Sequence, residues 1–142
     1  MRMPVVFIRA LLAIPLVAAA PSPTVVALSG GTEVLVSIPQ TFSPDRVKTG
    51  DMIQLTVASS VSIGGVAVVR KGARGQCALT LSQRNDILMH RCWVAAVDGQ
   101  RIVLSPDKTP DPNDLDTYLV LGPREQQAPF AFYTAKDVRV NP

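Results

Sequence analysis

The chain has few of the residues on which most enzymes depend. It contains one histidine, His90, two cysteines and two glutamates, Glu33 and Glu125. The nucleophile elbow Gly-x-Ser-x-Gly and the phosphate loop Gly-x-x-x-x-Gly-Lys-Ser/Thr are both missing. Most of the aspartates lie at predicted turns, which gives them a structural reason to be there and leaves no carboxylate pair for glycoside chemistry. We therefore predict no catalytic residues and no cofactor. His90 is better explained as a residue whose hydrogen bonds are satisfied within the fold than as a catalytic residue of an envelope hydrolase.

Aromatic residues make up only 5% of the chain, fewer than a base-stacking nucleic-acid surface or an aromatic sugar platform needs. Twelve prolines and nine glycines exclude a long-helix bundle. The net charge is +3, from 14 basic and 11 acidic residues. Without the first 19 residues, which hold Arg2 and Arg9, 12 basic and 11 acidic residues leave +1. We therefore expect no nucleic-acid partner.

The N-terminus has the order of a secretory signal peptide. Basic residues precede the apolar run Ala10–Ala20, and Pro21-Ser22-Pro23 follows. The run is too short to span a bilayer, which takes about 20 residues, so an uncleaved anchor is the weaker alternative. We predict a signal peptide over 1–19, cleavage near Ala19 or Ala20, and a periplasmic or secreted mature chain with no membrane span.

The rest of the chain predicts β-structure. Short β-branched runs alternate between apolar and polar residues, and Gly, Asn and Asp clusters separate them. The Gly64-Gly65 pair between two such runs is a strong signal for a tight hairpin. We predict a linker over 20–30 and a single domain over 31–142, an all-β small antiparallel barrel or sandwich of about eight short strands.

Cys77 and Cys92 are predicted to form a disulfide. If residues 83–86 form a hairpin loop and Ser82 pairs with Ile87, the two cysteines lie directly opposite each other. The same register places Leu88 and His90 on the cysteine face, with His90 opposite Leu79, and places Met89 on the other face. A redox pair or a zinc site is disfavoured, because Cys-x-x-Cys is absent and only one histidine is available.

The densest acidic stretch is 107–116, with Asp107, Asp111, Asp114 and Asp116. Extracellular calcium binds to oxygen-rich loops of this kind, but Leu115 stands where a ligand is expected, and no turn glycine or closing glutamate follows. We predict a solvated loop and no metal.

Residues 31–73 resemble a module of bacterial envelope proteins. The matching segments include Gly31–Val36, Val47–Asp51 and Val61–Val69, followed by Lys71-Gly72-Ala73. This stretch is similar to uncharacterised periplasmic proteins and distantly to the barrel segment of the type IV secretion outer-membrane-complex subunit. The resemblance implies an exported β-domain without catalytic residues.

We therefore expect a structural or protein-interaction module whose partner is another envelope protein. A small-ligand-binding barrel is the alternative. An unguarded strand edge recruits partner strands, and few charges guard Val66, Ala67, Val68 and Val69. These four residues are the candidate docking strand.

Overall fold

The computed structural model describes residues 25–111, 113 and 117–142. The predicted signal peptide, over residues 1–19, and residues 20–24 of the predicted linker lie outside this part. The described residues form eleven strands, a 3-10 helix and a short α-helix. The strands are β1 (Val26–Leu28), β2 (Glu33–Ser37), β3 (Met52–Val57), β4 (Val61–Ile63), β5 (Val66–Val69), β6 (Arg74–Leu81), β7 (Ile87–Ala95), β8 (Arg101–Ser105), β9 (Leu119–Val120), β10 (Phe130–Thr134) and β11 (Val138–Val140). The helices are η1 (Pro44–Arg46) and α1 (Pro123–Gln127).

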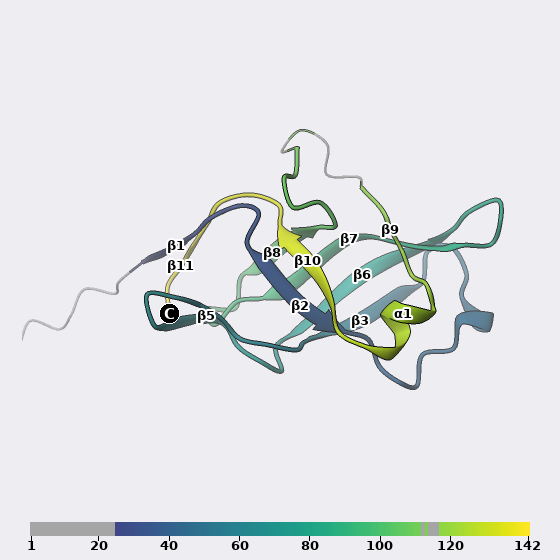
Figure 1. Ribbon diagram of the computed structural model, residues 1–142, viewed down its shortest axis with the longest axis horizontal. Helices are drawn as coiled ribbons and strands as arrows, with labels where there is room; N and C mark the ends of the chain where they lie inside the picture. Colours follow the sequence, from purple (N-terminus) through teal and green to yellow (C-terminus); the bar gives the residue numbers. More distant parts are fainter. Residues whose placement is uncertain (1–24, 112, 114–116) are drawn as a thin grey trace, which may run out of the picture.

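Six antiparallel strands close into a barrel (Figure 1). The order around it is β2, β3, β6, β7, β8 and β10, and β10 pairs back with β2. Each strand therefore lies beside its predecessor and its successor among these six, as in an up-and-down barrel. The predicted all-β fold, a small antiparallel barrel or sandwich, is confirmed as a barrel, although the described residues form eleven strands in all rather than about eight.

Two ribbons lie together at one end of the barrel, on the left of Figure 1: β1 paired with β11, and β4 paired with β5. The β4–β5 turn is the predicted Gly64-Gly65 hairpin, and both glycines have positive φ. Leu28 and Val140 of one ribbon, and Val68 of the other, are fully buried in the core. The ribbons therefore contribute side chains to the core, and the predicted linker includes strand β1.

Alternation along each strand divides core from surface. In β3 the even-numbered residues are exposed, whereas Ile53, Leu55 and Val57 are buried. One polar side chain, Thr134, is fully buried, and its hydroxyl donates to the Ser29 carbonyl at 2.8 Å and accepts from the Thr32 N–H at 3.0 Å. Its hydrogen bonds fasten the start of β2 to β10, so its burial does not leave an unsatisfied group.

The β6–β7 hairpin differs from the predicted register by one residue near its turn. Leu81, rather than Ser82, pairs with Ile87. The Ser82 N–H donates to the Asp86 carbonyl, and Asn85 has a φ of 63°. A three-residue loop that ends in a left-handed residue is a standard hairpin connection, and asparagine tolerates that conformation. The loop is therefore one residue shorter than predicted.

A β-bulge then shifts the register back. The pairing changes between Gln76 and Ala78, and Arg91 opposite them has a φ of 52°. One extra residue in β7 reverses its alternation, so that Met89 and Cys92 both face the core. The predicted faces of Leu88, His90 and Met89 are therefore wrong. Met89 is buried, and His90 lies on the outer face opposite Ala78 rather than Leu79.

Candidate functional site

The predicted disulfide is present. Cys77 and Cys92 are bonded, their Cα atoms are 4.1 Å apart, and the described residues include no free cysteine. Both cysteines are buried, with at most 2% of either residue exposed. The bridge joins β6 to β7 beside the bulge, so its position in the core indicates a structural role.

The candidate docking strand is β5. It pairs with β4 on one side, and on the other side the Val68 carbonyl accepts a hydrogen bond from the Val97 N–H at 3.0 Å. Val68 and Val69 are fully buried, whereas Val66 is 40% exposed. An incoming strand would therefore find Val66 and Ala67 at the surface and the rest of β5 tied into the core.

His90 lies in a small polar cluster on the outside of the barrel. Its Nε2 is 2.8 Å from the Thr80 hydroxyl, and its ring centroid is 4.9 Å from that of Tyr118. A Thr–His pair resembles a nucleophile and base, but such pairs also need a group that orients the histidine. No carboxylate in the described part of the chain bonds to the other ring nitrogen. The contacts are those of a histidine anchored by a hydroxyl and an aromatic ring.

The acidic loop belongs only partly to the described structure, since Asp114 and Asp116 lie outside it. In its described part, the Asp111 carboxylate accepts from the Asn113 N–H at 2.9 Å, as in an Asx turn. Within residues 25–111, 113 and 117–142 there is no group of three His, Cys, Asp or Glu residues placed to hold a metal. Those same ranges contain no helix long and apolar enough to cross a membrane.

One wall of the barrel contains no acidic residue. Strands β3, β6, β7, β8 and β9 have three arginines and neither Asp nor Glu. We call the outward-facing residues of these strands the acid-free wall. They are Met52, Gln54, Thr56, Arg74, Gln76, Ala78, Thr80, Leu88, His90, Arg91 at the bulge, Trp93, Ala95, Arg101, Val103 and Val120.

Strand register arranges the acid-free wall into rows, because residues directly opposite in neighbouring strands share a face. One row crosses Gln54, Gln76 and Trp93. Arg74 and Arg101 lie on the side of this row nearer the ribbons. The remaining rows are mainly apolar and join Met52 to Ala78 and His90, and Thr80 to Leu88 and Val120. The wall therefore has a cationic end and an apolar end.

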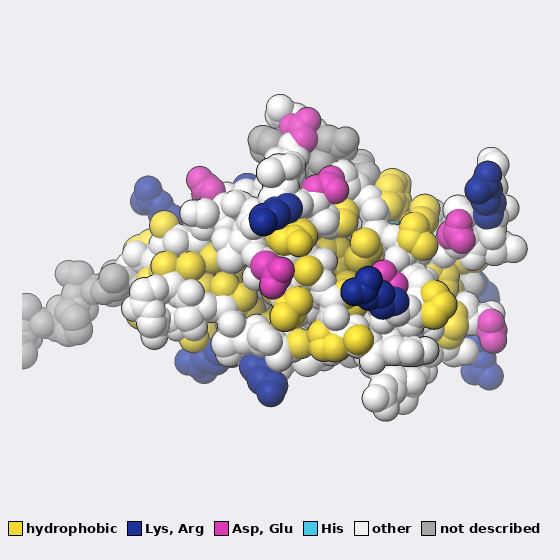
Figure 2. Space-filling view, in the orientation of Figure 1, with side chains coloured by type: hydrophobic (Ala, Val, Ile, Leu, Met, Phe, Trp, Pro, Cys, Tyr) yellow, Lys and Arg dark blue, Asp and Glu magenta, His cyan; other side chains and the backbone are white. Residues whose placement is uncertain are grey.

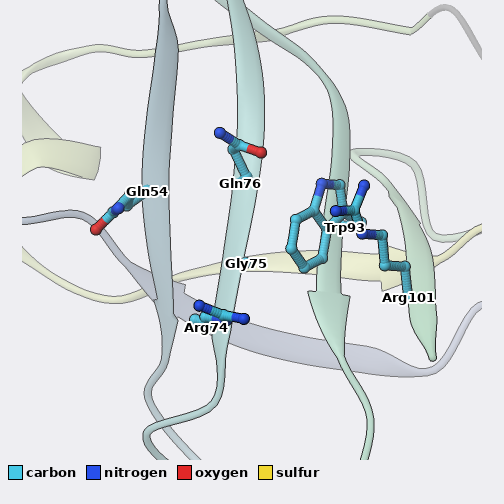
Figure 3. Close-up of a pocket in the computed structure, with 6 residues that line it drawn as sticks. All are labelled: Gln54, Arg74, Gly75, Gln76, Trp93 and Arg101. Atoms are coloured by element: carbon cyan, nitrogen blue, oxygen red, sulfur yellow. The ribbon is translucent and has the colours of Figure 1, made fainter. Parts of the chain in front are cut away.

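The cationic end forms a hollow of about 370 Å³ (Figure 3). Its lining is Gln54, Arg74, Gly75, Gln76, Trp93 and Arg101, which come from four adjacent strands. The Arg101 guanidinium carbon is 4.2 Å from the Trp93 ring centroid, a cation–π contact. Gly75 lets β6 approach β7 closely beneath the hollow, because a Cβ there would collide with the Trp93 carbonyl oxygen and lie 2.8 Å from Val94 Cγ1.

The polar side chains of the hollow make no hydrogen bond or ion pair with the described residues. Arg74 makes no hydrogen bond or ion pair with a described residue, and the amides of Gln54 and Gln76 are equally without described partners. Arg101 contacts only the Trp93 ring among them. Guanidinium groups bind carboxylates through paired N–H bonds, so the set is suited to an acidic ligand.

Among the described acidic residues, five accept hydrogen bonds from backbone N–H groups: Asp51, Asp98, Asp111, Glu125 and Asp137. Asp98 is an example: Asn141, through its backbone N–H, is the largest cause of a lowered pKa for this carboxyl, and Gln100 lowers it further. Figure 2 shows the face nearest the viewer in Figure 1, which carries β2, β10 and α1, and acidic and basic side chains are interspersed there. The acid-free wall therefore differs in charge pattern from that face.

Sequence reasoning did not find this site. The signal was present, because the segments 52–57, 74–81, 87–95 and 101–105 contain no acid. The net charge of the whole chain hides this local lack of acids. The rows of side chains could not be predicted either, because they depend on the order of the strands in the barrel. No family model, curated protein or solved structure matches the chain.

Proposed function

We propose that the protein is an exported, non-catalytic β-barrel domain of a bacterial cell envelope, and that it binds another envelope protein through the acid-free wall. The observation that carries this proposal is a wall where Arg74 and Arg101 make no ion pair with a described residue and where apolar side chains are exposed. Exposed apolar patches with polar surroundings mark interaction sites.

Export is supported by independent features. The N-terminal order of charge and apolar residues is that of a signal peptide, and a buried disulfide persists in oxidising compartments. The resemblance of residues 31–73 to envelope proteins agrees with both. Residues 31–73 are also distantly similar to a subunit of a secretion channel. The proposal therefore extends to membership of the protein in such an assembly.

A photocrosslinking amino acid at Gln76 tests the binding role in cells that export the protein. We expect an adduct of one discrete mass from position 76. The matched control is position 127 in α1, a glutamine that is exposed and lies outside the wall, whereas Gln76 is half-buried. Equal adducts from both positions, or none from position 76, would contradict the proposal.

The hydrolase alternative has its own test. Purified protein is assayed against ester, peptide and glycan substrates beside the His90→Ala variant. Hydrolysis that the wild type performs and His90→Ala loses would refute a non-catalytic role, whereas we expect both proteins to be inactive.

One observation favours a small-ligand binder as a second candidate. Several polar groups line the hollow, from Gln54, Gln76 and Arg74, although it lies on the outer wall and not at the barrel mouth. Calorimetric titration with small di- and tricarboxylates decides this. Binding that Arg74→Gln abolishes, without any adduct from position 76, would favour the second candidate.

A further inference from the structure

We propose that the acid-free wall binds a linear protein segment of about six residues that combines acidic and apolar side chains. This inference rests on the proposed function and names the chemistry of the partner. It follows from the size of the wall, from its charge, from its exposed aliphatic residues and from the paired state of its strands.

The size of the wall favours a single segment over a globular face. From Arg74 to Thr80 is six residues along β6, about 20 Å at 3.3 Å per residue. The three spacings from β3 to β8 add a width of about 14 Å. A rectangle of this size, about 300 Å², is well below the roughly 800 Å² that each partner buries in a standard interface. An extended segment of six residues spans the same 20 Å.

The charge of the wall requires acidic groups in the partner. Arg74 and Arg101 both line the hollow, and no carboxylate from the described residues neutralises either of them. Arg101 is held over Trp93, which lowers the conformational freedom that it would lose on binding a carboxylate. The two Gln amides beside them can donate to and accept from the polar groups of a bound chain.

The apolar end distinguishes a protein segment from an acidic saccharide. Met52 is 52% exposed, Val120 is 50% exposed, and Tyr118 beside His90 is 49% exposed. Aliphatic side chains such as Met52 and Val120 are best covered by aliphatic partners, whereas sugar rings stack on aromatic platforms. The one indole of the wall already has Arg101 against its ring. An acidic segment with Leu, Ile or Val is therefore the better fit.

The middle of the wall favours recognition by side chains. Strands β6 and β7 are paired on both sides there and offer no free edge for strand addition, whereas among the described strands β9 pairs only with β7, and β3 pairs with β2 only at Thr56 and Val57, both at the margins of the wall. Peptide recognition at an edge depends mainly on backbone hydrogen bonds. On this wall, the amino-acid composition of the bound segment determines binding, rather than an exact backbone register. The charge and the apolar content of the segment are therefore what an experiment should measure.

The test is a selection of random twelve-residue displayed peptides on the purified, disulfide-bonded domain. We expect enrichment of Asp and Glu together with Leu, Ile or Val. Selected peptides are then synthesised and titrated while the fluorescence of Trp93 is followed. Trp93 is the only tryptophan and lies in the hollow, so a bound peptide reports its own location.

Variants assign the binding to the wall. Arg74→Gln and Arg101→Gln should each weaken a selected peptide about three- to tenfold, and Val120→Ser should weaken it severalfold. The matched control is Arg124→Gln, which removes an exposed cation from α1 and should leave affinity unchanged. Circular dichroism confirms that each variant is folded. Added salt should weaken the wild type more than the double arginine variant, since salt screens exposed charges.

Each other outcome overturns the inference. Selected peptides without an acidic excess, or peptides that bind Arg74→Gln and Arg101→Gln as tightly as Arg124→Gln, would contradict it. Binding of polygalacturonate or of phosphatidylglycerol vesicles, with no peptide bound, would assign the wall to a saccharide or a lipid surface. The proposed function would survive the first two results if position 76 still crosslinked to a protein. It would fail if that adduct were also absent.

Discussion

The disulfide gives a stability prediction with a calculable size. Cys77 and Cys92 are 15 residues apart in sequence. In the chain-entropy model, a cross-link over about 15 residues lowers the entropy of the unfolded chain and stabilises the fold by about 3 kcal/mol. A single domain has only about 5–15 kcal/mol of stability, so the bond contributes a large share. Reduction should lower the melting temperature by roughly 12 °C for a domain of this size.

Urea unfolding of the oxidised and the reduced protein measures this contribution. We expect the free energy of unfolding to fall by about 3 kcal/mol on reduction, with a larger m-value because the unfolded chain becomes more extended. The Cys77→Ala/Cys92→Ala variant should lose somewhat more, since both side chains are buried and alanine leaves a cavity.

The reduced wild type is the matched control, because it keeps both sulfur atoms in the core. If the free energy of unfolding falls by less than about 1 kcal/mol in fully reduced protein, the chain-entropy reasoning is refuted. Packing alone would then hold β6 against β7. Native protein with two free thiols would refute the bond itself.

Three further predictions follow from single features. Gly75→Ala should destabilise the fold by about 3 kcal/mol, measured by urea unfolding, because its Cβ would collide with backbone at Trp93; an unchanged midpoint contradicts this. Asp98→Asn should lower the melting temperature at pH 7. The lowered pKa means that Asp98 contributes stability above its unfolded pKa and loses it as pH falls through the folded value, so the difference should shrink below about pH 4. Exported protein should have the mass of a chain that begins at residue 20 or 21, and full-length protein in that compartment contradicts cleavage.

Local alternation explains why the strands could be predicted. In β3, apolar Ile53, Leu55 and Val57 alternate with the residues between them, which predicts one buried face. The barrel places that face inward. The short elements were missed for the same reason. Strand β1 and helix η1 have only three residues each, and α1 has five, too few for a period to be recognised.

The disulfide was predicted correctly although the register beside it was not. The hairpin loop is one residue shorter than expected, which moves every pair near the turn by one position. The bulge at Arg91 adds one residue to β7 and moves the pairs beyond it back. The two offsets cancel at the cysteines. Asn85 offered a clue to the first offset, because asparagine favours left-handed turns, whereas an arginine in that conformation gives no comparable signal.

The distribution of charge shows why a small net charge does not exclude a charged binding surface. Acids in this chain serve turns and chain ends: Asp51 binds the Lys48 N–H, and Asp137 binds the Gly30 N–H. Arg74 and Arg101 have no such structural hydrogen bond with a described residue. A strand residue that only needed to be soluble could equally be Asp, Glu or Lys, and pairing with a neighbouring acid would cost the fold nothing. Two arginines and two amides that make no hydrogen bond or ion pair with a described residue, beside an indole and on strands without any acid, therefore point to selection for a partner that supplies the carboxylates.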